Sequence, residues 1–389
     1  MRFILYIALI ILGIFWWQGS LDSIRSQESQ TMSFAETEHT PLAGNVDDYF
    51  STNSALALVS RKKVNELTDP ELAGIVLMPS FEKQHSLTDI KEWIEDYHIG
   101  GMMILRNDYN QTDQQYINSV YAENNQNNLP LFTSIDAEPS LVQYRIPGLV
   151  NIPKTSQIVS EYQSRDVAAR ISSYIDNMGV NINFAPVYDN NTNISVIGNR
   201  SFGAEADNID ALANAFALET KGHNIIPTAK HFPGHGNVSG DTHKGLQTIS
   251  GELSELPQFK SAIKNNIPMI MIGHLAIADN PDWETDGLPA TLSPKITTEL
   301  LRDELGFEGL VVTDALNMGA LDGFANADMM ALDAGADIIL IPKNIKETHQ
   351  RILARLENDS LFKDALREKA EHIIRMKLVL RNIQTKNAE

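Results

Sequence analysis

Short apolar runs recur along most of this chain and alternate with longer stretches that have the periodicity of amphipathic helices. Some runs are apolar at every position, such as Met269–Ile272, which is typical of strands buried on both faces of a parallel sheet. The alternation predicts repeated β/α units. Eight strand segments are predicted: Ala73–Met78, Gly101–Leu105, Leu131–Asp136, Asn181–Pro186, Ile226–His231, Pro268–Leu275, Gly309–Asp314 and Asp337–Pro342.

Eight strands alternating with helices close naturally into a barrel. A doubly wound open sheet would more often have about five or six strands and a glycine-rich phosphate turn, which the sequence lacks. We therefore expect the α/β class and a single (β/α)8 barrel of the TIM type. Helices are predicted over Ser164–Met178, Ile209–His223, Ser293–Leu305 and Ala325–Ala334, with a C-terminal helix over Ile345–Ile383.

The N-terminus has the pattern of a secretory signal or a short membrane anchor, since Arg2 precedes an uncharged apolar run from Phe3 to Trp17. We assign this role to residues 1–21. Residues 22–65 are rich in Ser, Gln, Thr, Glu and Asp, which indicates a linker or lead-in, and the barrel is expected over 66–389. We expect an exported protein, periplasmic or on the outer face of the cytoplasmic membrane, that touches the membrane only through this segment.

The composition excludes several kinds of partner and chemistry. The 31 Lys and Arg against 50 Asp and Glu give a formal charge of −19, which disfavours nucleic acid or anionic lipid as the main partner. The absence of cysteine excludes disulfides, thiolate zinc sites and cysteine nucleophiles. We expect a monomer that uses no metal and no cofactor.

Polar residues are concentrated where the predicted strands end, which is where the active site of such a barrel lies. Asp136 and Asp314 each end a strand, and Arg200 lies in the loop after the fourth. The fifth strand ends in a glycine-rich stretch, residues 230–243, that begins Lys-His-Phe-Pro-Gly-His-Gly and ends Asp-Thr-His. These residues are predicted to share one mouth of the barrel.

The stretch resembles the glycoside hydrolase family 3 enzymes, specifically the bacterial β-N-acetylhexosaminidases that recycle peptidoglycan. Their signature, Lys-His-Phe-Pro-Gly-His-Gly followed by Asp-Ser/Thr-His, is present without a gap. The resemblance extends over about residues 70 to 345. Further matches lie at Ile197–Gly203, Pro289–Ser293, Leu305–Gly309 and Thr313–Leu316.

The resemblance implies roles for particular residues. Asp314 matches the nucleophile, which must be a carboxylate that attacks the anomeric carbon and then leaves. His243, supported by Asp241, matches the acid–base, and a histidine can both donate and accept a proton near neutral pH. Double displacement with retention follows. Four further positions match contacts to sugar hydroxyls: Asp136, Arg200, Lys230 and His231.

The segment after Asp136 departs from the family pattern. The family usually reads Asp-Gln-Glu-Gly-Gly-Arg-Val-Gln-Arg, whereas this chain reads Asp-Ala-Glu-Pro-Ser-Leu-Val-Gln-Tyr-Arg. Tyr144 stands where a sugar-contacting arginine is expected, and Arg145 can replace that arginine only if the backbone shifts by one residue. The departure bears on affinity and on the sugar accepted.

Simpler interpretations accompany these roles. Asp314 could cap the following helix, and Arg200 could be a structural ion pair. A metal could bind His231, His235, Asp241 and His243, although the prolines and glycines break the helix that such spacing needs. We interpret His274, inside an apolar strand, as a core histidine.

Three functions remain open from the sequence. The first is a retaining exo-β-N-acetylglucosaminidase that acts on peptidoglycan-derived or chitin-type glycans. The second is another β-glycosidase or a glycoside phosphorylase on the same barrel, because a histidine acid–base avoids a carboxylate that would repel phosphate. The third is a catalytically weakened sugar-binding protein of the envelope.

Overall fold

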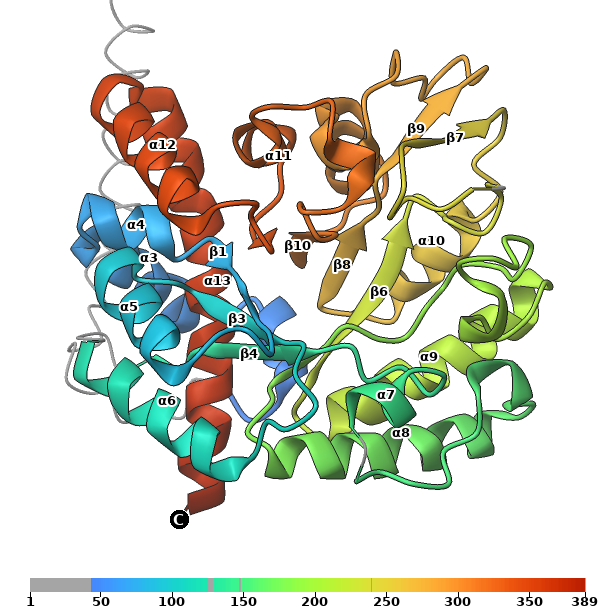
Figure 1. Cartoon of the computed structure of the whole chain (residues 1–389), viewed down its shortest axis with the longest axis horizontal. Coiled ribbons are helices and arrows are strands. Elements are labelled where there is room, and N and C mark those ends of the chain that lie inside the picture. Colours follow the sequence, from blue (N-terminus) through green and yellow to red (C-terminus); the bar gives the residue numbers. More distant parts are fainter. Residues whose placement is uncertain (1–42, 125–128, 147, 239, 389) are drawn as a thin grey trace, which may run out of the picture. The chain divides into compact units, whose positions relative to one another are not determined.

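A curled layer of parallel strands runs through the centre of the folded unit, with helices outside it (Figure 1). The computed structural model describes residues 43–124, 129–146, 148–238 and 240–388. Seven strands pair in parallel in the order β10-β8-β6-β5-β4-β3-β2. Their bounds are β2 Ser80–Phe81, β3 Gly101–Ile104, β4 Phe132–Ile135, β5 Ile182–Asn183, β6 Ile226–Phe232, β8 Met269–Ile272 and β10 Leu310–Thr313.

One further parallel pair of strands connects to both edges of the seven-stranded sheet. Strand β1 (Leu77–Met78) pairs with β11 (Ile339–Leu340), and only Pro79 separates β1 from β2. At the other edge Val312 of β10 forms a parallel bridge with Ile338, which precedes β11. Each of the eight predicted segments therefore contains a strand, and the α/β fold with a parallel sheet is confirmed.

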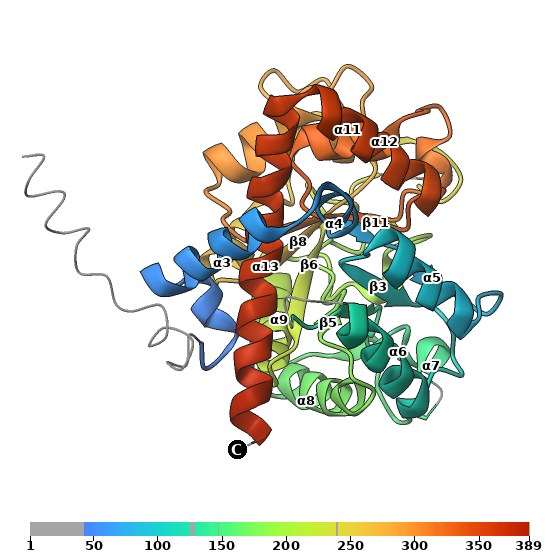
Figure 2. The ribbon, with the colours of Figure 1, turned by 90° about the vertical axis from the view of Figure 1, so that its left-hand side faces the viewer.

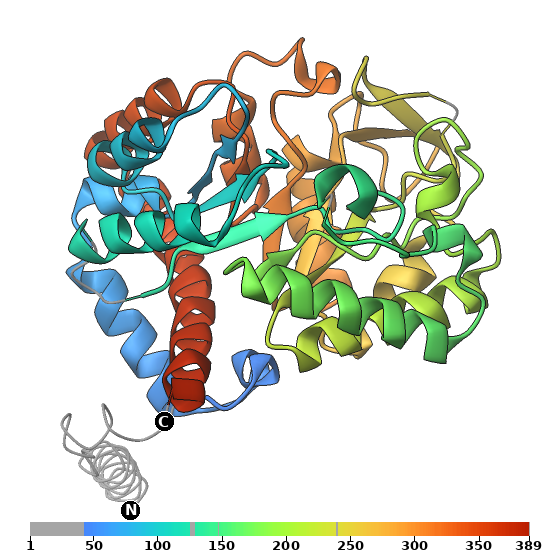
Figure 3. The ribbon, with the colours of Figure 1, turned by 60° about the horizontal axis from the view of Figure 1, so that its bottom comes forward.

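One helix follows almost every strand, as β/α units require. Helices α8 and α9 lie side by side outside the sheet (Figure 3). The α-helices are α3 Ser54–Glu66, α4 Asp69–Gly74, α5 Leu87–Tyr97, α6 Gln111–Asn124, α7 Val142–Arg145, α8 Glu161–Asn177, α9 Ala206–Gly222, α10 Leu256–Lys264, α11 Ala327–Ala334, α12 Ile345–Asn358 and α13 Ser360–Ala388. The 3-10 helices are η1 Val46–Phe50, η2 Thr155–Gln157, η3 Gly198–Arg200, η4 Ala290–Leu292 and η6 Gly319–Leu321, and η5 Lys295–Glu304 is a π-helix.

The structure corrects two predicted elements and adds a sheet that was not predicted. The start of the first predicted strand is helical, because Thr68 and Glu71 form a capping box that begins α4. The predicted C-terminal helix is two helices, because Asp359 is extended and its side chain accepts a hydrogen bond from the Phe362 N–H at 2.9 Å. A separate two-stranded parallel sheet, β7 (Gln247–Ser250) with β9 (Leu275–Ala278), was not predicted.

The folded unit begins at Ala43, ahead of the expected start near residue 66. Helix α3 packs along α13 (Figure 2), and η1 adds a hydrogen bond of 3.3 Å from the Tyr49 hydroxyl to the Glu308 carbonyl. These elements are short, so their few buried positions, such as Leu56 and Val64, give a weak periodic pattern in the sequence. The predicted signal or anchor at residues 1–21 lies outside the described residues. Among the described helices, none combines the length and apolar character needed to cross a membrane.

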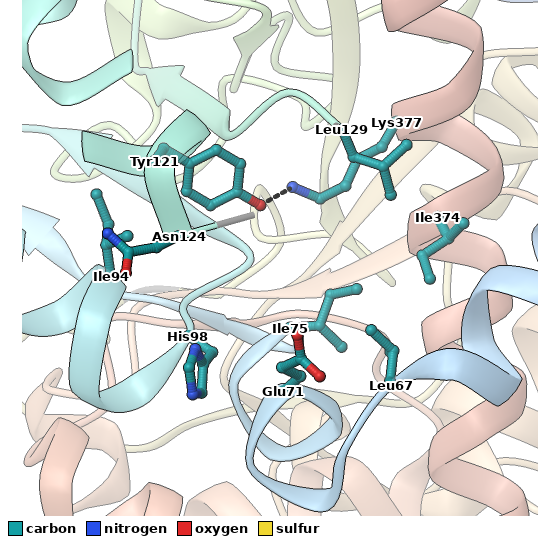
Figure 4. A pocket seen from close by; sticks show the side chains of 10 residues that line it. All are labelled: Leu67, Glu71, Ile75, Ile94, His98, Tyr121, Asn124, Leu129, Ile374 and Lys377. Atoms are coloured by element: carbon teal, nitrogen blue, oxygen red, sulfur yellow. Dashed lines mark hydrogen bonds between the residues drawn. The ribbon is translucent and has the colours of Figure 1, made fainter. Parts of the chain in front are cut away.

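Lys377 of α13 is fully buried near the end of the sheet where β3 and β4 begin, and its side chain points toward Tyr121 (Figure 4). Its buried ammonium donates to the carbonyls of Gly100 at 2.6 Å and Pro130 at 2.7 Å, just ahead of β3 and β4. It also lies 4.5 Å from the centre of the Phe132 ring and 3.4 Å from the Tyr121 hydroxyl. Burial lowers the pKa of Lys377 to about 7.

The lowered pKa of Lys377 makes stability depend on pH. An unfolded lysine keeps its proton up to about pH 10, so between pH 7 and 10 the unfolded chain binds more protons and this group adds stability as pH rises. We expect the free energy of unfolding of the wild type, minus that of Lys377→Met, to rise by about 2 kcal/mol from pH 7 to pH 9. Urea unfolding of both proteins at pH 7 and pH 9 measures this difference in the free energy of unfolding. Lys91→Met, at a half-exposed site on α5, should show no such rise, and a constant difference for Lys377→Met would contradict the prediction.

Candidate active site

A pocket of about 380 Å³ lies where the carboxyl ends of the strands meet. It brings together seven of the eight predicted site residues, and the eighth, Asp241, lies directly behind His243. The polar residues of its lining are Asp136, Arg145, Arg200, Lys230, His231, His235, Thr242, His243, Asp314 and Asn317. The apolar residues are Met103, Leu105, Leu141, Val196, Met271, Ala315, Met318, Leu340 and Ile341.

A buried carboxylate that the sequence analysis did not assign holds two of the predicted cations. Glu138 accepts two hydrogen bonds of 2.8 Å from Arg200, and its Oε1 lies 2.6 Å from the Lys230 ammonium. The other contact of Lys230 is Asp136 at 2.7 Å. Burial raises the pKa of Glu138, but Arg200 and Lys230 outweigh burial and hold it well below its usual range. Arg200 is therefore a structural ion pair as well as a residue of the pocket lining.

Asp189, just beyond β5, fixes the orientation of His231. The Nδ1 of His231 lies 2.7 Å from a carboxylate oxygen of Asp189, so this ring nitrogen donates and Nε2 is left for the pocket. The same carboxylate accepts the backbone N–H of His231 at 3.0 Å and of His235 at 2.8 Å. Asp189 is fully buried. It lies three residues past the predicted strand, so the search for polar residues at strand ends missed it.

The short helix α7 decides which residue of the divergent segment reaches the pocket. Arg145 lines it, with its guanidinium 3.7 Å from Asp136, whereas the Tyr144 side chain is 68% exposed and lies outside the lining. Arg145, and not Tyr144, is therefore the residue of this segment that reaches the pocket.

Asp314 follows β10 and is half-buried in the pocket. Its carboxylate accepts the N–H of Ala315 at 2.8 Å, and no helix begins at this point, so it does not act as a helix cap. Burial raises its pKa, but His231, His274 and the Ala315 N–H together hold the pKa below its ordinary value. Asp314 is thus an ionised carboxylate. His274 is fully buried, and its two ring nitrogens contact Thr291 and the Ala315 carbonyl, which confirms it as a core histidine.

His243 and Asp241 form a pair on the loop after β6. The Nδ1 of His243 lies 2.9 Å from Asp241 Oδ1, and the His243 N–H donates to the same oxygen at 2.9 Å. The second oxygen of Asp241 lies 3.4 Å from the Lys244 ammonium. Desolvation raises the pKa of Asp241, but the contacts with His243 and Lys244 outweigh it and lower the pKa. Asp241 therefore stays ionised and orients the ring so that Nε2 is free to exchange a proton.

The residues weighed as a metal cluster have separate partners. His231 contacts Asp189, His235 contacts Thr242 at 2.9 Å, and His243 contacts Asp241. Within residues 43–388, as far as they are described, no group of three or more such side chains converges as a metal site.

Known proteins are similar to this chain in sequence and in fold. Residues 59–376 match the model of the glycosyl hydrolase family 3 N-terminal domain. The beta-hexosaminidase A of Pseudoalteromonas piscicida is 30% identical over 330 residues, which cover 75% of this chain and 55% of that protein. A beta-hexosaminidase of Methylococcus capsulatus is 30% identical over 285 residues, 69% of this chain and 83% of that protein.

Among solved structures, a glycoside hydrolase family 3 beta-N-acetylglucosaminidase from Paenibacillus sp. superposes with a TM-score of 0.75 at 29% identity. The superposition covers 82% of this chain and 63% of that one, and the chain spans little more than half of the Pseudoalteromonas relative. Because the family model covers most of the described residues, the chain belongs to glycosyl hydrolase family 3, as the motif at residues 230–243 predicted.

Proposed function

We propose that the protein is a retaining exo-β-N-acetylglucosaminidase that acts as a monomer on peptidoglycan-derived or chitin-type glycans. The observation that carries the proposal is that Asp314 and the His243–Asp241 pair meet at one pocket, from different strands. The names of the relatives, beta-hexosaminidases, support the choice of sugar. The proposal includes a (β/α)8 barrel closed through the β1–β11 pair, and export directed by residues 1–21 to the periplasm or the outer face of the membrane.

The first step of the proposed reaction forms a covalent intermediate. A carboxylate oxygen of Asp314 attacks the anomeric carbon, the glycosidic C–O bond breaks, and its electron pair goes to the leaving oxygen. That oxygen takes the proton from Nε2 of His243. In the second step a water molecule gives a proton to His243, attacks the anomeric carbon and releases Asp314. Two inversions give net retention.

Charged groups hold the sugar in a pocket that is partly shielded from solvent, where their hydrogen bonds to hydroxyls are strong. Asp136, Lys230, His231, Arg145 and Arg200 supply donors and acceptors around it. The pocket volume of about 380 Å³ is large enough to hold a terminal sugar.

A panel of glycosides tests the function. The purified full chain should release 4-nitrophenol from the β-N-acetylglucosaminide much faster than from the β-glucoside, and proton NMR should show the β-anomer as the first product. The rate should not depend on phosphate. A sugar phosphate product would identify a phosphorylase, and binding without turnover would identify a sugar-binding protein.

The neighbours Arg145 and Tyr144 provide a prediction on binding. Arg145→Ala should raise KM about tenfold or more and change kcat less, because it removes a charged hydrogen-bond donor from the pocket. Tyr144→Ala should leave KM near the wild-type value, because Tyr144 is exposed outside it. Steady-state kinetics on the 4-nitrophenyl substrate measure both, and the reverse order would show that Tyr144 contacts the sugar.

A further inference from the structure

The loop that carries His243 is attached to the turn that follows Asp314. The N–H of Gly319 donates to the His243 carbonyl at 3.2 Å, and the N–H of Ala320 donates to the Thr242 carbonyl at 3.0 Å. Both donors lie in η6, a few residues after Asp314. The loop with the proposed acid–base thus rests on the backbone of the segment that carries the proposed nucleophile.

Two further contacts hold the same loop in place. The Thr242 side chain is buried and lies 2.9 Å from Nε2 of His235, at the base of the loop. The Asn193 amide donates to the Gly240 carbonyl at 3.0 Å. The His243 ring itself is 64% exposed, so packing around the ring does little to place it, and these backbone and side-chain contacts decide where it lies.

The approach of the loop leaves no room for a side chain at position 319. A Cβ on Gly319 would lie 2.7 Å from the His243 carbonyl oxygen and 3.1 Å from the Lys244 carbonyl carbon, both of them backbone atoms. The φ of Gly319 is not in the left-handed region, so alanine fits its conformation and the conflict is with the loop alone. Gly323, four residues further on, has no atom within 4 Å of such a Cβ.

We infer that Gly319 is a positioning residue for proton transfer. Because it has no side chain, the loop can pack closely against it, and this contact places His243 where it can act on the same glycosidic bond as Asp314. The inference rests on the proposed function, and it assigns to Gly319 no contact with the sugar. Moving the loop outward would withdraw the proton donor while Asp314 and the sugar contacts of β4 and β6 stay in place.

The variant Gly319→Ala, with Gly323→Ala as the matched control, tests this through the leaving group. A phenoxide leaving group needs a proton, whereas 2,4-dinitrophenoxide leaves without one. We expect Gly319→Ala to lower kcat/KM on phenyl β-N-acetylglucosaminide about a hundredfold and on the 2,4-dinitrophenyl glycoside about threefold or less. Gly323→Ala should match the wild type on both. Equal losses on the two substrates, or no loss on either, would overturn the inference.

Hydrogen exchange separates failure of this inference from failure of the proposed function. Amides of residues 240–246 should exchange about tenfold faster in Gly319→Ala than in Gly323→Ala, while those of β6 and β10 stay unchanged. If the wild type hydrolyses no β-N-acetylglucosaminide, the proposed function fails, yet the exchange rates still decide whether Gly319 seats the loop. Thr242→Val, which removes the contact with His235 and leaves Gly319 intact, should shift the exchange and the substrate ratio in the same direction. Unchanged exchange in both variants would contradict the seating.

Discussion

Asp314→Asn should lower kcat/KM on 4-nitrophenyl β-N-acetylglucosaminide at least about a thousandfold, because an amide cannot form the glycosyl-enzyme bond. The unfolding temperature should stay close to that of the wild type, since the substitution replaces a carboxylate by an isosteric amide at a half-buried site. Asp322→Asn is the matched control, because Asp322 lies on the same turn, is 75% exposed and forms a surface ion pair with Lys343. It should retain full activity.

Rescue by azide tests whether Asp314 acts as the nucleophile or in proton transfer. In Asp314→Gly, azide can enter the space of the lost carboxylate and attack the anomeric carbon of a dinitrophenyl glycoside, which loses dinitrophenoxide. Restored turnover with an α-glycosyl azide product would confirm a nucleophile on that face. A β-glycosyl azide would instead assign Asp314 to proton transfer and contradict the proposed mechanism.

Glu138→Gln should lower the free energy of unfolding by about 3–5 kcal/mol, the cost of leaving a buried charge without its partner. Glu138 is fully buried and joins Arg200 and Lys230, and without it Arg200 would lose the carboxylate that binds it, while Lys230 would keep its contact with Asp136. Burial by itself would disfavour the charge on Glu138, but Arg200 and Lys230 outweigh burial and hold its pKa low. Urea unfolding at pH 7 measures the loss.

A surface pair of the same geometry provides the control for Glu138. Arg106 binds both oxygens of Asp108 at 2.6 and 2.7 Å, but Asp108 is largely exposed, and Asp108→Asn should remain as stable as the wild type. The KM of Glu138→Gln should also rise, because Arg200 and Lys230 lose the group that orients them. A variant as stable as the wild type would show that the three charges are not coupled.

The sequence predicted those features that depend on local pattern. The apolar runs marked a strand in each of the eight predicted segments but missed β2, and the rule that strand ends carry the site led to Asp136, Lys230 and Asp314, which line one pocket. Glu138 and Asp189 were missed because they lie beyond the strand ends, and their partners, Arg200 and His231, come from distant segments. The hydrogen bonds from the Gly319 and Ala320 N–H groups to carbonyls of the loop also depend on tertiary contact. The periodicity of the sequence does not predict such contacts.

The ion pairs beneath the pocket have a consequence for how ligands arrive. Three carboxylates, Asp136, Glu138 and Asp314, are offset by three cations, Arg145, Arg200 and Lys230, within a chain of formal charge −19. The outer field repels polyanions but exerts little force on an uncharged carbohydrate. Encounter with such a ligand therefore proceeds by unaided diffusion, and added salt should barely alter its rate.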